Sequence, residues 1–108
     1  MSARQRLPDR RNSESFNFEF NGLRYCCTIS RFPDGRLAEI FINNAKAGSH
    51  SDAAAKDAAV VASIALQYGV PVSVIRRTLL RDPRGTASSP LGVALDLIAD
   101  SSGANDAA

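Results

Sequence analysis

One stretch of the chain, residues 31–49 (RFPDGRLAEIFINNAKAGS), constrains the fold more than any other. It begins with a tight turn at residues 33–35 (PDG), where proline presets φ and glycine accepts the left-handed position. A strongly apolar strand follows over residues 37–42, and its Ile-Phe-Ile run predicts burial on both faces. The polar segment 43–50 must then be a loop. Strands before this stretch and helices after it can pack together only if this strand lies between them.

Two further strands are predicted upstream. Strict alternation over residues 15–20 places three phenylalanines on one side and polar residues on the other, which is typical of a half-buried strand. Asn21 and Gly22 follow as a strong hairpin signal, because both residues tolerate the positive φ of a type I′ turn. The return strand, residues 23–30, places four apolar side chains on one face: Leu23, Tyr25, Cys27 and Ile29.

A long first helix is expected to run to about residue 68. Ser49 or Ser51 can cap it, Asp52 suits its first turn, and Gly69 is its C-terminal stop. Its small side chains let another backbone come close, either the sheet or a symmetry mate. All its apolar side chains together form a wide stripe of helical period: Ala54, Ala58, Val61, Ala62, Ala65, Leu66 and Tyr68.

Two shorter helices complete the chain. The second begins at Pro71 and reaches about residue 80, since proline suits the first helical turn. We expect its inward side chains to be Ile75, Leu79 and Leu80, and its outward ones to be Arg76, Arg77 and Arg81. Ser89 and Pro90 form a strong start signal for the third helix. Its buried residues should be Leu91, Ala94, Leu95 and Ile98.

The order of strands first and helices after predicts an α+β fold, with a three-stranded antiparallel meander followed by three helices packed on one face. The chain length of 108 residues suits a single domain, which we place at residues 13–99. Such a small sheet has two edges and a second face to cover. We therefore expect a homodimer.

Charge is concentrated at the N-terminus. Residues 1–12 form a flexible basic arm, and residues 100–108 a disordered tail. Although the formal net charge is +2, the arm alone carries +3, which leaves −1 for the remainder. The arm's arginines are candidates for contact with nucleic acid or another partner: Arg4, Arg6, Arg10 and Arg11.

The cysteines and the hydropathy pattern indicate the compartment. Cys26 and Cys27 are adjacent, so on a strand they point to opposite faces and are poorly placed to share a metal or bond to each other. Two thiols without a spacing pattern or a signal peptide fit a reducing cytoplasm. The absence of a long apolar run argues against a membrane span. We expect a cytoplasmic protein.

From about residue 18 to residue 99, the chain resembles the TSCPD domain. The similarity is concentrated in DGRLAEIFINNAKAGS (residues 34–49) and in the Gly-Val-Pro junction at residues 69–71. The resemblance implies kinship with the C-terminal region of adenosylcobalamin-dependent ribonucleotide reductases and with small free-standing homologues. It also implies an association with ribonucleoside-diphosphate reductase and a protein partner of that kind.

The motif that names the family is degraded. Its Thr-Ser-Cys-Pro-Asp falls on residues 87–91, ASSPL, so that Ser89 replaces the cysteine and Leu91 the aspartate. No thiolate zinc site is expected there, because zinc needs about four Cys or His ligands. Ribonucleotide reduction requires a thiyl radical, reducing cysteines and a radical-generating cofactor. We expect no catalytic residue, metal or cofactor in this chain.

The loop between the third strand and the first helix is the first place to look for a ligand. It leads into a helix N-terminus, where free N–H groups and the helix dipole favour an anion. It lacks the nucleotide-binding pattern Gly-x-x-x-x-Gly-Lys-Ser/Thr, and a plain capped loop is the alternative. The candidate residues are Asn43, Asn44, Lys46, Gly48 and Ser49.

Two functions from different classes follow from the sequence. The first is a small non-catalytic accessory or regulatory domain related to the reductase. The alternative is a nucleic-acid or nucleotide-binding module that uses the basic arm and the loop at residues 43–49. Against that alternative, the remainder of the chain is nearly neutral and lacks the interleaved aromatics of single-strand binding proteins.

Overall fold

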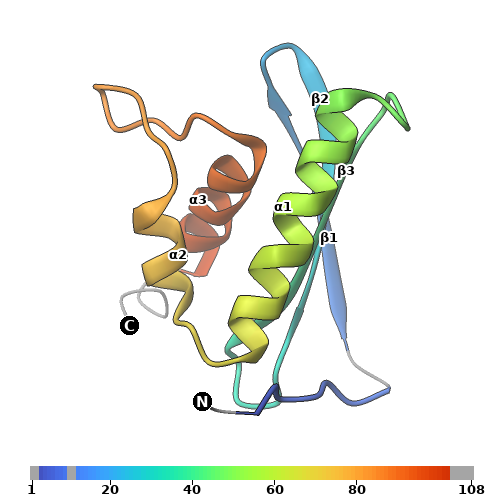
Figure 1. Cartoon of the computed structure of the whole chain (residues 1–108), viewed down its shortest axis with the longest axis vertical. Helices are drawn as coiled ribbons and strands as arrows, with labels where there is room; N and C mark the ends of the chain where they lie inside the picture. The colour runs from blue at the N-terminus through green and yellow to red at the C-terminus, as the bar shows by residue number, and fades with distance from the viewer. Residues whose placement is uncertain (1–2, 10–11, 103–108) are drawn as a thin grey trace.

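The computed structural model describes residues 3–9 and 12–102, and it confirms the α+β fold (Figure 1). Three antiparallel strands in the order β1-β2-β3 are followed by three helices. The elements are β1 (Ser13–Phe20), β2 (Leu23–Arg31), β3 (Leu37–Asn44), α1 (His50–Gln67), α2 (Val72–Thr78) and α3 (Pro90–Ser102). Residues 103–108 of the expected tail, and Arg10 and Arg11 of the arm, lie outside the described residues.

The first hairpin forms as its sequence predicts. Asn21 and Gly22 take φ values of 52° and 76°, the positive angles that the tight turn requires. The turn sets the register between β1 and β2, so that Phe18 lies opposite Tyr25 and Phe16 opposite Cys27. The Phe18 and Tyr25 rings stack with their centroids 5.4 Å apart.

The helices cover one face of the sheet, and the core lies between them. On that face Cys27, Ile40 and Ile42 are completely or almost completely buried. All four residues expected to be buried on α3 are buried: Leu91, Ala94, Leu95 and Ile98. The prediction that β3 is buried on both faces holds for residues 37–40, which are all buried, and is wrong at Phe41, which is 46% exposed.

Element ends differ from the sequence prediction at three places. β3 continues to Asn44, since Asn43 and Asn44 still pair with β2. α2 stops at Thr78, so Leu80 lies beyond the helix and is 74% exposed instead of turned inward. α3 runs to Ser102, into the segment that was expected to be a tail.

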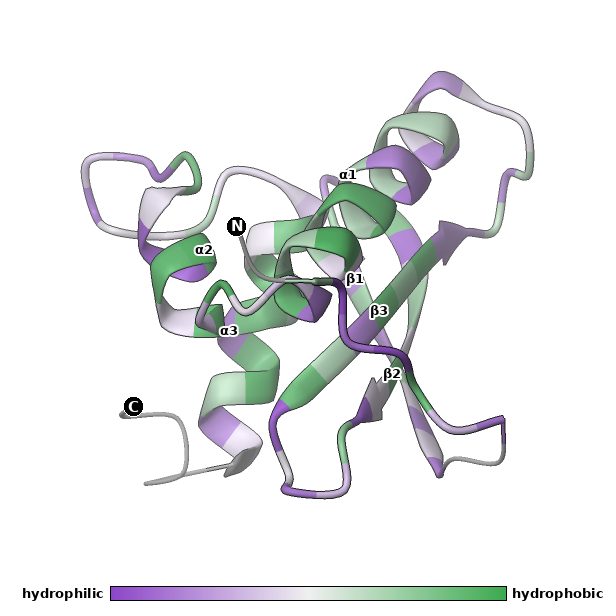
Figure 2. Ribbon diagram, turned by 60° about the horizontal axis from the view of Figure 1, so that its bottom comes forward, coloured by the Kyte–Doolittle hydropathy of each residue, from purple (hydrophilic) through white to green (hydrophobic). Residues whose placement is uncertain are grey.

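The rotation of α1 about its axis is a larger difference. Of the predicted apolar stripe, Ala62 and Leu66 are buried, whereas Val61 is 67% exposed and Tyr68 is 41% exposed. The side that faces the sheet instead combines small and polar residues: Asp52, Ala55, Ala59, Ala62, Ser63, Leu66 and Gln67. Figure 2 shows hydrophobic residues dominating the C-terminal half of α1, and part of this apolar surface faces solvent.

The buried polar residues of α1 bond to the backbone of β3. β3 is an edge strand, so the backbone groups along its outer side have no neighbouring strand. The Ser63 hydroxyl accepts from the Ile40 N–H at 2.8 Å and donates to the Ile40 carbonyl at 3.0 Å. The Gln67 amide donates to the Ala38 carbonyl at 3.0 Å. Helix α1 therefore satisfies the edge of the sheet that it covers.

We predict that Ser63→Ala lowers the free energy of unfolding by about 1–3 kcal/mol, because it leaves a buried N–H and a buried C=O of Ile40 without a partner. Urea unfolding followed by circular dichroism measures the change. Ser13→Ala, at an exposed position of β1, is the matched control and should shift stability by less than about 0.5 kcal/mol. Equal effects of the two substitutions would contradict the edge-bonding role.

Candidate functional site

The loop between β3 and α1 is closed around a carboxylate of its own chain. Asp52, in the first turn of α1, is completely buried. Its Oδ1 accepts the backbone N–H of Asn44 at 2.9 Å, and its Oδ2 accepts the N–H of Gly48 at 3.0 Å. Gly48 has φ 80°, a left-handed conformation that suits glycine. The chain can therefore turn its N–H groups inward at this point.

The negative charge of Asp52 is balanced by Lys56, one turn further along α1. The Lys56 ammonium lies 2.9 Å from its Oδ2. The N–H of Asn44, then the Lys56 side chain and the N–H of Gly48, lower the pKa of Asp52 from 3.8 to about 2. Asp52 is thus ionised at neutral pH, where it holds the start of α1 to the end of β3.

Asn44 and Ser49 complete the internal bonding of the loop. The Asn44 side chain accepts the N–H of Lys46 at 2.9 Å and donates to the Ser51 hydroxyl at 2.8 Å. Ser49 is the N-cap of α1, accepting the N–H of Asp52 at 3.2 Å and donating to the Lys46 carbonyl at 2.8 Å. The side chains of these candidates serve the loop itself.

The side chains that the loop turns outward are those of Asn43, Lys46 and His50, which are exposed. An external anion would meet the Lys46 ammonium, whereas the N–H groups of Asn44 and Gly48 already bond to Asp52. Ligand binding by residues 43–49 stays a prediction. The residue that sequence reasoning does not assign to this loop is Asp52, which it places only in the first turn of the helix.

The described part of the basic arm lies against the end of α1. The Gln5 N–H donates to the Gln67 carbonyl at 2.7 Å, and Arg4 Nε donates to Gln67 Oε1 at 2.6 Å. Arg36, in the turn before β3, donates to Gln5 Oε1 at 3.0 Å. An open pocket of about 570 Å³ lies beside the contact between the arm and Gln67. It is lined by Arg4, Arg6, Leu7, Glu39 and Gln67.

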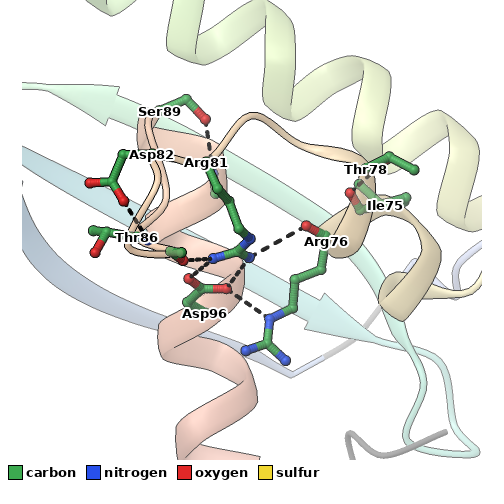
Figure 3. Close-up of polar contacts among 10 residues, drawn as sticks. Ile75, Arg76, Thr78, Arg81, Asp82, Thr86, Ser89 and Asp96 are labelled. Atoms are coloured by element: carbon green, nitrogen blue, oxygen red, sulfur yellow. Dashed lines mark hydrogen bonds and ion pairs between the residues drawn. The ribbon is translucent and has the colours of Figure 1, made fainter.

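A second polar cluster joins α2, the following turn and α3 (Figure 3). Arg81 donates two hydrogen bonds to the Asp96 carboxylate, from Nη1 to Oδ2 at 2.8 Å and from Nη2 to Oδ1 at 2.7 Å. Arg76 Nε adds a bond to the same Oδ1 at 2.8 Å. Arg81, followed by Arg76, lowers the pKa of Asp96 to about 2. The expectation that Arg76 and Arg81 point outward is wrong for both.

The turn after Arg81 is fastened by the same arginine. Arg81 Nη1 donates to the Gly85 carbonyl at 3.0 Å, while Asp82 Oδ1 accepts the N–H groups of Arg84 and Thr86 at 2.8 and 3.0 Å. The sequence signal for this cluster was Asp96, the one charged residue within the run LGVALDLIA. A carboxylate in such an apolar run requires a partner.

At the degraded motif, the residues act in helix initiation. Ser89 accepts the N–H of Gly92 at 3.2 Å through its hydroxyl, and its carbonyl accepts the N–H of Val93 at 3.0 Å. Pro90 is the first residue of α3. A Cβ on Gly92 would lie 2.9 Å from the Ala87 Cβ, which is closer than real contacts allow. Small residues therefore let this segment fold against α3.

The cysteines are arranged as their adjacency predicts. Cys27 is fully buried, and burial, with a smaller contribution from Cys26, raises the pKa of its thiol to about 12. Cys26 is partly buried. Cys27 therefore stays a neutral thiol at physiological pH and a poor nucleophile.

Two observations concern the part of the chain that the structure describes. Within residues 3–9 and 12–102, no cluster of three or more His, Cys, Asp and Glu side chains is arranged to hold a metal ion. Over the same residues, no helix has the length and apolar character needed to cross a membrane.

Comparison with known proteins points to one family. The family model described as the TSCPD domain matches residues 5–100. The chain is 42% identical over 72 residues to a vitamin B12-dependent ribonucleotide reductase of Rhodopirellula baltica, an alignment that covers 67% of this chain and 7% of that protein. A protein of the same description from Streptantibioticus cattleyicolor is 32% identical over 90 residues, which are 81% of this chain and 15% of that one. No solved structure is significantly similar.

We predict that acid weakens this protein through Asp52. Its folded pKa of about 2 lies below the usual 3.8, so its stabilising contribution is present above pH 4 and is lost as the pH falls from about 4 to about 2. Asp52→Asn should lower stability at pH 7 and flatten the pH dependence in that window, as measured by urea unfolding. Glu14→Gln, at an exposed position of β1, should leave both properties unchanged.

We also predict that Arg81→Lys makes residues 82–88 more mobile. Lysine cannot form both hydrogen bonds to Asp96 together with the bond to the Gly85 carbonyl. Hydrogen exchange of a peptide covering these residues, followed by mass spectrometry, should become at least several-fold faster. The matched control is Arg84→Lys, since Arg84 has an exposed side chain. Unchanged exchange in Arg81→Lys would show that the turn holds without this contact.

Proposed function

Because the chain belongs to the TSCPD domain family, we propose that it acts as a non-catalytic accessory or regulatory domain that associates with a vitamin B12-dependent ribonucleotide reductase. One observation carries the proposal: residues 5–100 match the family, while the chain spans only 5–15% of the reductases that resemble it. The shared region is therefore one small part of those enzymes.

The chemistry of the cysteines supports a role without catalysis. Radical reduction of a ribonucleotide needs cysteines that approach the substrate and exchange electrons. Cys26 and Cys27 are neighbours on β2, so their side chains leave opposite faces of the sheet. Because the Cys27 thiol is buried with a pKa of about 12, it stays protonated at neutral pH and does not react as a thiolate.

The loop at residues 43–49 is the contact that we propose for the reductase. Its backbone is fixed by Asp52, so Asn43 and Lys46 are presented on a rigid support at one end of the sheet. Rigid presentation lowers the entropy cost of binding. The segment also contains part of DGRLAEIFINNAKAGS, the stretch in which the resemblance to the family is concentrated.

Nucleic-acid binding is not favoured as an alternative. Arg4, Arg76 and Arg81 bond to side chains of the same domain, which reduces the set of free cations available to phosphates. The curated relatives are described as reductases.

The test combines the full chain with a B12-dependent ribonucleotide reductase from the same cell. We expect the chain alone, supplied with adenosylcobalamin, a dithiol and ribonucleoside diphosphates, to form no deoxyribonucleotide. Added to the reductase, it should bind in a calorimetric titration and change the rate of turnover. Lys46→Glu should weaken binding roughly tenfold, while Arg77→Glu on α2 should bind as the wild type does.

Two outcomes would overturn the proposal. Deoxyribonucleotide formation by the chain alone would make it an enzyme. A complete lack of binding to the reductase at high micromolar concentration would remove the accessory role.

A further inference from the structure

The outer side of α1 carries an apolar surface that the domain does not use. Val60, Val61, Ile64 and Tyr68 are 46%, 67%, 38% and 41% exposed. In Figure 1 the sheet lies behind α1, and α2 and α3 lie to one side of it. The opposite side of α1 is buried against β3, so the helix has an apolar surface facing solvent in addition to its packed side.

The exposed residues follow the spacing of a helix-packing seam. Asp57, Val61, Ile64 and Tyr68 are separated by four, three and four residues. That alternation is the heptad spacing by which one helix packs along another. Ala54 continues the same line toward the N-terminus of α1. The surface is thus shaped to receive a helix along its length.

We propose that this surface pairs with the α1 helix of a second copy of this chain, the two helices running antiparallel. With the twofold axis between Val61 and Ile64, each Val61 contacts Ile64 of the other copy. The same axis places Asp57 opposite Tyr68 of the other copy. A patch that complements itself in this way meets the requirement for a twofold-symmetric interface.

Hydrogen bonding and charge favour this partner and this direction. Among the described residues, neither the Asp57 carboxylate nor the Tyr68 hydroxyl has a bonding partner, and both lie on the seam. In the antiparallel pair the phenol of each copy can donate to the carboxylate of the other. A parallel pair would instead bring the two Asp57 carboxylates together, and like charges on a packed seam repel.

Small side chains beside the seam allow the two helices to approach closely. Ala54 is exposed and Ala65 is partly exposed, and neither projects far from the helix backbone. A twofold axis between antiparallel helices brings the same flank of each helix together, so the flank with Ala54 and Ala65 faces the same small residues of the other copy. Helices packed in this way lie about 8–10 Å apart.

The first experiment measures the association of the full chain by sedimentation equilibrium. We expect a dimer, and we expect Val61→Glu to raise its dissociation constant roughly tenfold or more, because two carboxylates would enter the centre of the seam. Phe41→Glu is the matched control, since Phe41 is likewise an exposed hydrophobic residue, at 46% against 67% for Val61, but lies on the open face of the sheet. It should dimerise as the wild type does.

A second set of variants tests the register. Tyr68→Glu should weaken the dimer by placing two carboxylates opposite each other, and Tyr68→Lys should keep it by facing Asp57 with a cation. The double variant Asp57→Lys with Tyr68→Glu should restore the wild-type dissociation constant within about threefold.

The proposal is overturned by a wild-type chain that stays monomeric up to millimolar concentration. It is also overturned by a dimer that Val61→Glu leaves intact, which would place the interface elsewhere, or by a double variant that fails to recover association. None of these results depends on whether a reductase is the partner of the domain.

Discussion

Bonds from side chains of α1 to the backbone of β3 are the interaction on which the rest of the structure depends. Asp52, Ser63 and Gln67 are eleven and four residues apart, and eleven residues are close to three turns of helix. They therefore lie along one side of α1 and bond to the backbone of β3 at Asn44, Ile40 and Ala38. These bonds fix how α1 is rotated, close the loop at residues 43–49, and place Gln67 where the N-terminal arm meets it.

The sequence predicts those parts of the fold that depend on local rules. The Asn21-Gly22 turn and the cap at Ser89 form because backbone angles and a single hydroxyl determine them. The face of α1 could not be predicted in the same way, because period analysis assumes that apolar residues point inward. Here Ser63 and Gln67 point inward to serve an edge strand, and Val61 points outward. The information lies in a contact between residues more than twenty positions apart.

The two clusters of charged residues follow the same principle. Asp52 and Asp96 are each drawn into contacts whose partners come from other segments, β3 for one, α2 and its following turn for the other. Sequence reasoning identified the loop at residues 43–49 and the arginines of α2. It could not show that Asp52 bonds to the loop or that Asp96 bonds to the arginines. The fold follows from the order of strands and helices, and the family resemblance added the expected kinship with ribonucleotide reductases. The degraded motif keeps its part in starting α3, through a serine in the position of the family's cysteine.

The covering of β3 by α1 also limits how chains of this protein can assemble through their sheets. The backbone groups of Ala38, Ile40 and Asn44 bond to side chains of α1, so another strand cannot add at those points. β1 forms the opposite edge of the sheet. Two molecules joined through β1 would present a shielded edge at both ends, and the joined sheet could not extend further. Continuous strand-by-strand growth requires two open edges, so this helix protects the protein against fibrillar aggregation.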